Sequence, residues 1–228
     1  MKINEIFFSI QGEGKLAGVP SVFIRTSGCN LRCVWCDSPT TSWKPTGESF
    51  PIDAILDRVG DFSSRYVVLS GGEPMIADGV ELLTARLRED GYHVTIETAG
   101  TIWKDVVYDL ASVSPKLANS TPWERDEGRF ADLHEGHRIC LDTVRKFMRG
   151  GDYQLKFVVS EPSDLVEIDA ILAGLGEFES SNVLLMPEGV TSEALNAKGR
   201  WIADLCLDRG FRFCPRLHIF LYGNAPGT

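Results

Sequence analysis

The stretch Ser21-Val-Phe-Ile-Arg-Thr-Ser-Gly-Cys-Asn-Leu-Arg-Cys-Val-Trp-Cys36 joins an apolar, β-branched run to three closely spaced cysteines. Its first six residues predict a buried strand, because short runs of this kind bounded by turn residues are typical of sheets. The cysteines follow in the loop after that strand. In folds built from parallel strands, such loops carry the chemistry. The stretch therefore predicts a parallel sheet with a site at the carboxyl ends of its strands.

The rest of the chain repeats an alternation of strands and helices. Further strands are predicted at residues 66–70, 93–97, 110–114, 154–160, 182–186 and 211–213. Apolar residues at three- and four-residue spacing predict helices at residues 52–59, 80–90, 165–175 and 193–209. This order indicates an α/β fold whose parallel sheet is open or curled into a full or partial barrel. We expect one domain over residues 1–228, with an irregular polar insertion at about 119–136 as a candidate lid.

Composition and charge exclude several classes of protein. The 228 residues are 43% hydrophobic, which is typical of a globular chain and not of a disordered one. Lys and Arg number 23 against 32 Asp and Glu, and the resulting charge of −9 disfavours nucleic-acid and anionic-membrane partners. The sequence has no signal-peptide pattern and no apolar run of roughly 18–20 residues. We therefore expect a cytoplasmic protein.

The three clustered cysteines, Cys29, Cys33 and Cys36, indicate a metal centre. A tight group of thiols in a reducing compartment is more typical of metal binding than of disulfides. Thiolates suit zinc or an iron–sulfur cluster, and three of them leave one coordination position open, as catalytic centres do. The alternative is a structural zinc site with a remote fourth ligand. Cys206 and Cys214 lie among apolar residues and are interpreted as core thiols.

Two glycine-containing motifs flank the predicted strands. Ser70-Gly-Gly-Glu-Pro74 follows a strand, and it predicts either a tight turn or a close backbone approach to a ligand, with Glu73 accepting a hydrogen bond from an ammonium. Phe8-Ser-Ile-Gln-Gly-Glu-Gly14 places Gln11 and Glu13 between glycines. It is either a solvated turn or a segment that reads the edge of a flat heterocycle.

Other polar residues suggest additional contacts. Arg25 interrupts an apolar strand and must be paired, so a substrate carboxylate is a natural partner. Asp37-Ser-Pro-Thr-Thr41 is either a polar turn or a source of hydroxyl oxygens for magnesium. His134 and His137 have a ligand-like spacing, but their polar surroundings and Gly136 disfavour a metal site.

The cysteine triplet, with an aromatic residue before its last member, and the Gly-Gly-Glu-Pro motif together resemble the radical S-adenosylmethionine superfamily. Within it, further blocks are similar to the 7-carboxy-7-deazaguanine synthase family. These blocks are Phe8–Gly14, Arg25, Cys36–Ser38, Glu97–Thr101, Ser114–Lys116, Arg216–His218 and Tyr222–Asn224. The resemblance covers nearly the whole chain and implies a partial (β/α) barrel of the radical S-adenosylmethionine type.

The resemblance implies two cofactors. Cys29, Cys33 and Cys36 would hold a 4Fe-4S cluster whose fourth iron binds the amino and carboxylate groups of S-adenosylmethionine. Reduction of the cluster would cleave that cofactor to methionine and a 5′-deoxyadenosyl radical. The residues implied along S-adenosylmethionine are Trp35, Glu73, Gly100, Ser114, Pro115 and Lys116, with Met186–Gly189 as a weaker candidate.

The resemblance also implies the reaction. The substrate would be 6-carboxy-5,6,7,8-tetrahydropterin, whose ring contracts with loss of ammonia to 7-carboxy-7-deazaguanine in queuosine and 7-deazapurine biosynthesis. The implied substrate residues are Ile10, Gln11, Gly12, Glu13, Arg25 and Thr98. Magnesium would bind Ser38, where the family often has Thr. Some family members end in a shorter tail that reaches the substrate, whereas this chain continues to Thr228.

The resemblance implies a homodimer and a flavodoxin- or ferredoxin-like reductant. One alternative is an activase of glycyl-radical enzymes, which shares the cysteine spacing but acts on a protein; the Gln-Gly-Glu-Gly segment disfavours it. The other is a zinc-stabilised binding protein without catalysis, which predicts zinc in place of iron and sulfide.

Overall fold

A curved sheet of nine strands organises the computed structural model, which describes residues 1–225 and 227–228. The strands lie in the order β3-β1-β2-β4-β5-β6-β7-β8-β9. Their bounds are β1 Lys2–Ile10, β2 Pro20–Thr26, β3 Glu48–Ser49, β4 Tyr66–Gly71, β5 His93–Thr98, β6 Leu110–Val113, β7 Asp152–Val159, β8 Val183–Pro187 and β9 Arg212–Phe213. From β2 to β9 all neighbours are parallel, whereas β1 is antiparallel to both β2 and β3. Among the described residues β3 and β9 do not pair with each other, so the barrel is partial, and the predicted fold class is confirmed.

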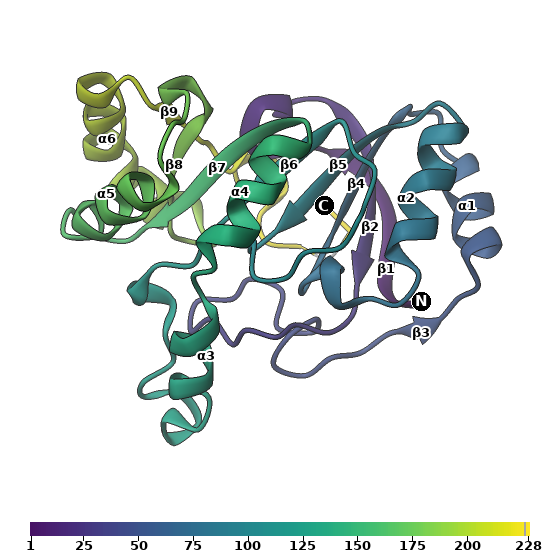
Figure 1. Cartoon of the computed structure of the whole chain (residues 1–228), viewed down its shortest axis with the longest axis horizontal. Helices are drawn as coiled ribbons and strands as arrows, with labels where there is room; N and C mark the ends of the chain where they lie inside the picture. Colours follow the sequence, from purple (N-terminus) through teal and green to yellow (C-terminus); the bar gives the residue numbers. More distant parts are fainter. Residues whose placement is uncertain (226) are drawn as a thin grey trace.

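Helices connect the parallel strands and cover the outside of the sheet (Figure 1). These helices are α1 Ile52–Gly60, α2 Val80–Glu89, α4 Leu141–Gly150, α5 Asp164–Leu175 and α6 Ser192–Arg209. Two more helices have other places: α3 Ala131–His137 precedes α4, and α7 Leu217–Tyr222 follows the last strand, with His218 in the lining of the cavity described below. The core between helices and sheet includes fully buried Ile24, Leu69, Ile96, Phe147 and Phe157. Because the central strands are covered by helices on one side, their outward-facing residues are apolar, and their inward-facing residues are free to form a site.

Several regions differ from the sequence expectation, among them β3, α4 and α7, which were not predicted. Strand β1 was not predicted, because a bulge between Ile3 and Glu5 disturbs its alternation of apolar and polar residues. The 119–136 segment was expected to be irregular, but it contains short 3-10 turns at Ala118–Ser120 and Arg125–Gly128 and most of α3. In Figure 1 this segment projects from one end of the sheet, beside the loop that follows β2.

No helix in the described part of the chain is long and apolar enough to span a membrane.

Candidate active site

A cavity of about 480 Å³ lies against one face of the sheet. Its lining includes Arg25 from β2, Ser70 from β4, Glu97 from β5 and Ser112 from β6. Arg25 pairs with Ser70 across β2 and β4, and Glu97 pairs with Ser112 across β5 and β6. Directly paired residues point to the same face of a sheet, so the strand register alone gathers these polar side chains on the inner surface.

Most of the residues singled out in the sequence meet in this cavity. The lining contains Ile10, Gln11, Gly12, Glu13, Arg25, Cys29, Cys33, Trp35, Cys36, Ser38, Thr98, Ser114 and Lys116, together with Met186. Three other candidates, Glu73, Gly100 and Pro115, are not among its lining residues. The cysteine loop, the Gln-Gly-Glu segment and the ends of β5 and β6 therefore form a single site.

The three clustered cysteines lie at one end of the cavity, against an apolar patch that contains Leu31 and Ala99. Burial raises the pKa of the Cys29 thiol to about 11 and that of Cys33 to about 12, and it also raises the pKa of Cys36. Without a metal these side chains are neutral thiols, and a bound metal must displace their protons.

The three thiols offer the donor set that an iron–sulfur cluster requires. Cys29, Cys33 and Cys36 pack in one cluster of side chains and line the same cavity. Thiolates are the usual ligands of 4Fe-4S clusters, and three of them leave one iron open to another ligand. The chemistry of these donors therefore fits an iron–sulfur cluster.

The Gly-Gly-Glu motif packs against the chain just before the first cysteine. A Cβ atom on Gly72 would lie 2.0 Å from the carbonyl oxygen of Gly28, so only glycine permits this approach. The amide of Glu73 donates to the same oxygen at 2.9 Å. The motif therefore makes a close backbone approach to the start of the cysteine loop, and its approach to a ligand stays a prediction.

The carboxylate of Glu73 is fully buried and joins two strand ends. It accepts hydrogen bonds from the Met75 amide at 3.1 Å, the Thr98 hydroxyl at 2.8 Å and the Ala99 amide at 2.9 Å. Burial raises its pKa, and these three hydrogen bonds oppose the rise. The expected contact of Glu73 with a cofactor ammonium stays a prediction.

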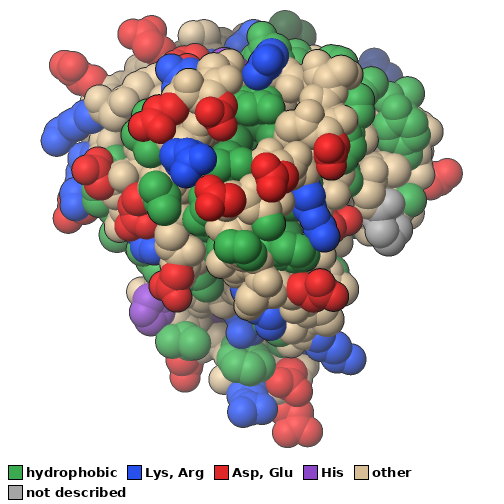
Figure 2. Space-filling view, turned by 90° about the vertical axis from the view of Figure 1, so that its right-hand side faces the viewer, with side chains coloured by type: hydrophobic (Ala, Val, Ile, Leu, Met, Phe, Trp, Pro, Cys, Tyr) green, Lys and Arg blue, Asp and Glu red, His purple; other side chains and the backbone are tan. Residues whose placement is uncertain are grey.

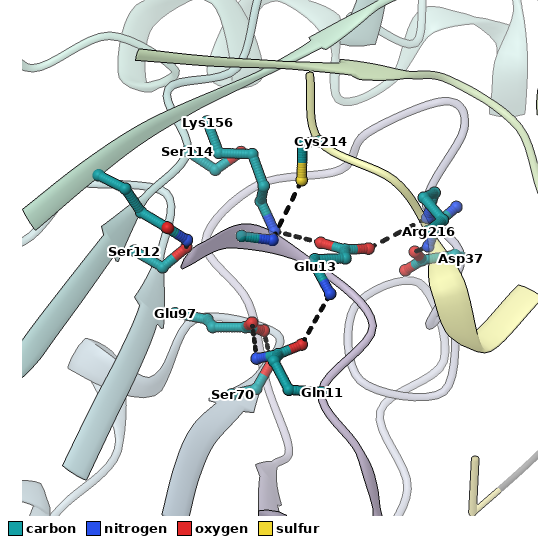
Figure 3. A network of polar contacts seen from close by, with 12 residues as sticks. Gln11, Glu13, Asp37, Ser70, Glu97, Ser112, Ser114, Lys156, Cys214 and Arg216 are labelled. Carbon is teal, nitrogen blue, oxygen red and sulfur yellow. Dashed lines mark hydrogen bonds and ion pairs between the residues drawn. The ribbon is translucent and has the colours of Figure 1, made fainter. Parts of the chain in front are cut away.

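The other end of the cavity is a network of buried charges (Figure 3). Glu13 pairs with Lys156 and, at 3.0 Å, with the Arg216 Nε, while a second nitrogen of Arg216 pairs with Asp37. Arg216 also donates to the carbonyl oxygen of Gly189 at 2.5 Å. The side chains of Lys156 and Arg216 are only 8% and 6% exposed, so each depends on its carboxylate partner.

The pKa values of this network move in the directions that ion pairing requires. Burial alone would raise the pKa of Glu13, but Lys156 and Arg216 hold it well below its ordinary value. Asp37 likewise has a lowered pKa, because Arg216 outweighs the effect of burial. The pKa values of Lys156 and Arg216 are raised, since Glu13 more than offsets the burial of each cation. All four groups are therefore charged near neutral pH.

Gln11 and Glu97 form a second polar group in Figure 3. The Gln11 amide nitrogen donates to Glu97 at 3.1 Å, and its oxygen accepts from the Glu13 amide at 3.1 Å. The Ser70 hydroxyl donates to the other oxygen of Glu97 at 2.9 Å. The orientation of the Gln11 amide is thus fixed, and one of its N–H groups is left for a ligand.

Arg25 already has partners within the protein. Its Nε lies 2.7 Å from a carboxylate oxygen of Glu5, and its Nη1 donates to the Ser38 hydroxyl at 2.7 Å. Ser38 in turn donates to Asp37 at 3.1 Å. A guanidinium has five N–H donors, so Arg25 retains donors for a substrate carboxylate while Glu5 holds its orientation.

Sequence reasoning did not assign roles to Lys156, Glu97 or Arg216. Lys156 carried a usable signal: it is a lone cation in an apolar strand, the same feature that identified Arg25. Glu97 and Arg216 lay in blocks that resembled the family, but nothing local indicated that both would line the cavity.

The three remaining cysteines do not join the cysteine loop. Cys206 is buried in the main core on α6, as predicted. Cys214 is fully buried, also as predicted, and its sulfur accepts a hydrogen bond from the Gly14 amide at 3.1 Å. Cys140 contacts the Thr143 hydroxyl at the start of α4.

Comparisons with known proteins agree with this site. Residues 23–119 match the family model described as the radical SAM superfamily, and this range includes β2, the cysteine loop and the Gly-Gly-Glu motif. The partial barrel and the thiol loop define a radical S-adenosylmethionine protein. Its family implies a 4Fe-4S cluster and S-adenosylmethionine as cofactors.

Relatives that align over nearly the whole chain identify the family within this superfamily. The chain is 47% identical to a 7-carboxy-7-deazaguanine synthase from Halobacterium salinarum, covering 100% of this chain and 93% of the relative. It is 45% identical to the enzyme of the same name from Rhodopirellula baltica, covering 99% and 88%. The crystal structure of QueE from Escherichia coli matches with a TM-score of 0.74 at 27% identity, covering 95% of this chain and 94% of that one. The chain belongs to the 7-carboxy-7-deazaguanine synthase family.

Proposed function

We propose that the chain converts 6-carboxy-5,6,7,8-tetrahydropterin to 7-carboxy-7-deazaguanine with loss of ammonia. The observation that carries this proposal is one cavity lined by Cys29, Cys33 and Cys36 and also by Gln11 and Arg25. The thiols fit an iron–sulfur cluster, and the amide and the guanidinium fit a flat, polar, carboxylated heterocycle. Membership of the family supports the same reaction.

Cys29, Cys33 and Cys36 would hold the cluster, which when bound and reduced supplies the electron that cleaves S-adenosylmethionine. Around them the chain excludes water with Leu31 and Ala99. We assign Trp35, Glu73, Gly100, Ser114, Pro115 and Lys116 to this cofactor. Among these, Lys116 is oriented by its own contacts: its ammonium donates to the Ser114 carbonyl and hydroxyl oxygens at 2.7 and 2.9 Å.

The residues assigned to the substrate position it rather than react with it. Gln11, with Ile10, Gly12 and Thr98, would contact the ring edge, and Arg25 would bind the carboxylate. Gly12 must be glycine because a Cβ atom there would lie 1.9 Å from a ring nitrogen of His218. Radical chemistry depends on holding the reacting hydrogen close to the radical carbon, so this positioning is the main contribution of the protein.

Magnesium is assigned to the junction of the two ends of the cavity. The Ser38 hydroxyl lies between Arg25 and Asp37, and all three line the cavity. A hydroxyl and a carboxylate are oxygen donors of the kind magnesium prefers, and this ion keeps several of its waters. Ser38 would hold the ion, which would supply positive charge for the carboxylate of the substrate.

A reductant is required, and we propose a flavodoxin- or ferredoxin-like protein, with the enzyme itself a homodimer. On the face shown in Figure 2, acidic and basic side chains are interspersed without forming a separate basic area. That face therefore does not support docking of an acidic reductant.

The cytoplasmic location stays a prediction.

The test is a reconstituted assay. Anaerobically purified protein is analysed for iron, sulfide and zinc, and then incubated with the pterin substrate, S-adenosylmethionine and reductant. We expect four irons and four sulfides per chain, as the cluster requires, and a product with the mass of 7-carboxy-7-deazaguanine that is absent without S-adenosylmethionine. Colourless protein with zinc would support the binding-protein alternative. An iron–sulfur protein that makes no product but activates a glycyl-radical enzyme would support the other.

A further inference from the structure

The 118–137 segment, which the proposed function does not use, lies against the cysteine loop. Residues 29–36 of that loop are called the cluster loop below. Two main-chain amides of the cluster loop donate into this segment. The Val34 amide donates to the Ser120 carbonyl oxygen at 2.7 Å, and the Arg32 amide donates to Nδ1 of His134 at 3.1 Å. Arg32 lies between Cys29 and Cys33, and Val34 lies between Cys33 and Cys36. The segment therefore contacts the main chain between each pair of successive cysteines and controls its path.

His134 is the buried centre of this contact. It is 1% exposed, and its Nε2 lies 2.8 Å from the Ser120 hydroxyl oxygen. That hydroxyl donates its own hydrogen to the Leu117 carbonyl oxygen at 2.6 Å, so it must accept from Nε2–H. The Nδ1 atom is therefore the acceptor that the Arg32 amide needs. Burial lowers the pKa of His134 to about 4, which keeps the ring neutral at pH 7.

Two carbonyl groups of the cluster loop are held as well, one by the 118–137 segment and one by Trp43. The Arg125 guanidinium donates to the Val34 carbonyl oxygen at 2.8 Å, and the Trp43 indole donates to that of Cys33 at 2.9 Å. The Trp43 ring packs edge-on against Phe130, with Arg125 at 3.9 Å from its centroid. The loop is thus fixed mainly through its peptide groups, and the sulfurs of Cys29 and Cys36 have only weak contacts, with the Leu31 amide and the Ser42 hydroxyl.

We propose that His134 is a positioning residue for the iron–sulfur cluster: with Ser120, it fixes the Arg32 amide and so holds Cys29 and Cys33 at the spacing the cluster requires. The segment expected as a candidate lid is then a support of the cluster loop. This inference rests on the proposed function only in taking the three cysteines as cluster ligands. Hydrogen-bonding partners outside the ligand set commonly change metal affinity by about 10–100-fold.

The test compares three variants of the full chain after anaerobic reconstitution. His134→Leu removes both ring nitrogens, while His134→Asn keeps an acceptor near the position of Nδ1. His137→Leu is the matched control, because His137 is an exposed histidine on the same helix whose Nδ1 contacts only the Leu133 carbonyl oxygen. The readouts are the rate of iron loss to a ferrous chelator and the electron paramagnetic resonance spectrum of the reduced cluster.

We expect His134→Leu to lose iron about 10–100-fold faster than the parent and to show an altered spectrum. His134→Asn should recover much of the parent behaviour, and His137→Leu should match the parent in both readouts. Parent-like iron loss and spectrum in His134→Leu would overturn the inference. An equal effect in His134→Leu and His137→Leu would do so as well, because it would reflect loss of helix stability alone.

A milder variant covers the case in which His134→Leu does not fold, as judged by circular dichroism. Ser120→Ala keeps the imidazole and removes only the hydroxyl that orients it. Faster iron loss in Ser120→Ala would support the inference, and an unchanged rate would contradict it. Failure of the proposed function would look different: the parent protein itself would bind no iron, or would hold its cluster and make no product.

Discussion

The two ends of the cavity are built in opposite ways. At the cysteine end the chain is fixed by hydrogen bonds to its peptide groups, and the sulfurs of Cys29 and Cys36 have only weak contacts with an amide and a hydroxyl. At the charged end the side chains themselves are paired, with Glu13 joined to Lys156 and Arg216. One end therefore keeps its donor atoms free for a metal, while the other satisfies its charges before any ligand arrives.

The difference shows how a site can be both ordered and ready to bind. Neutral thiols can be left without strong partners in an apolar pocket at little cost, whereas a buried charge without a partner is costly. A ligand at the charged end must exchange contacts with groups that are already paired. A metal at the cysteine end needs only to displace protons.

Among substitutions at the two ends of the cavity, Cys33→Ala at the cysteine end should have the largest effect. Loss of one of three ligands should abolish the iron–sulfur absorbance and turnover together, because no other described cysteine joins the loop. Cys140→Ala is the matched control, since Cys140 is half-buried and contacts Thr143 away from the cavity. An iron-free but active Cys33→Ala protein would refute the mechanism.

Glu13→Gln should cause the next largest change, in stability. It leaves Lys156 and Arg216 buried beside an uncharged amide, so we expect the free energy of unfolding in urea to fall by about 3–5 kcal/mol. The control is Asp53→Asn, which removes a mostly exposed pair with Arg86 and should cost less than about 1 kcal/mol. Similar losses in both variants would show that the charged end does not depend on pairing.

The charged end should also make the fold sensitive to acid. The pKa values of Glu13 and Asp37 lie below their ordinary values of 4.5 and 3.8, so their stabilisation is complete above those values and is lost as the pH falls below them. We expect the free energy of unfolding to decrease between about pH 5 and pH 3, and to do so less steeply in Glu13→Gln. Equal slopes in parent and variant would assign the acid sensitivity to other carboxylates.

Ser38→Ala should have the smallest effect, at the junction of the two ends. It should raise the magnesium concentration needed for full activity by about tenfold, while iron and sulfide content stay unchanged. Ser38→Thr keeps the hydroxyl and should behave as the parent. Unchanged magnesium stimulation in Ser38→Ala would remove Ser38 from the proposed magnesium site.

The sequence by itself determined the parallel strands, four of the helices that connect them and the cysteine loop at the carboxyl end of β2; it did not predict α4, which connects β6 to β7. These features depend on local patterns: short β-branched runs, helical spacing of apolar residues, and three thiols within eight positions. Strand β1 escaped this reasoning because its bulge interrupts the pattern.

Only the tertiary structure decided which polar groups meet. Glu13 lies 143 residues from Lys156 and 203 from Arg216, and the curved sheet brings all three together. Likewise, the contact of His134 with Arg32 spans 102 residues, so nothing local marked the 118–137 segment as a support for the cysteines. The periodicity of a sequence predicts the face on which a side chain lies. Strand order and register decide which buried polar groups become partners, and both depend on the whole fold.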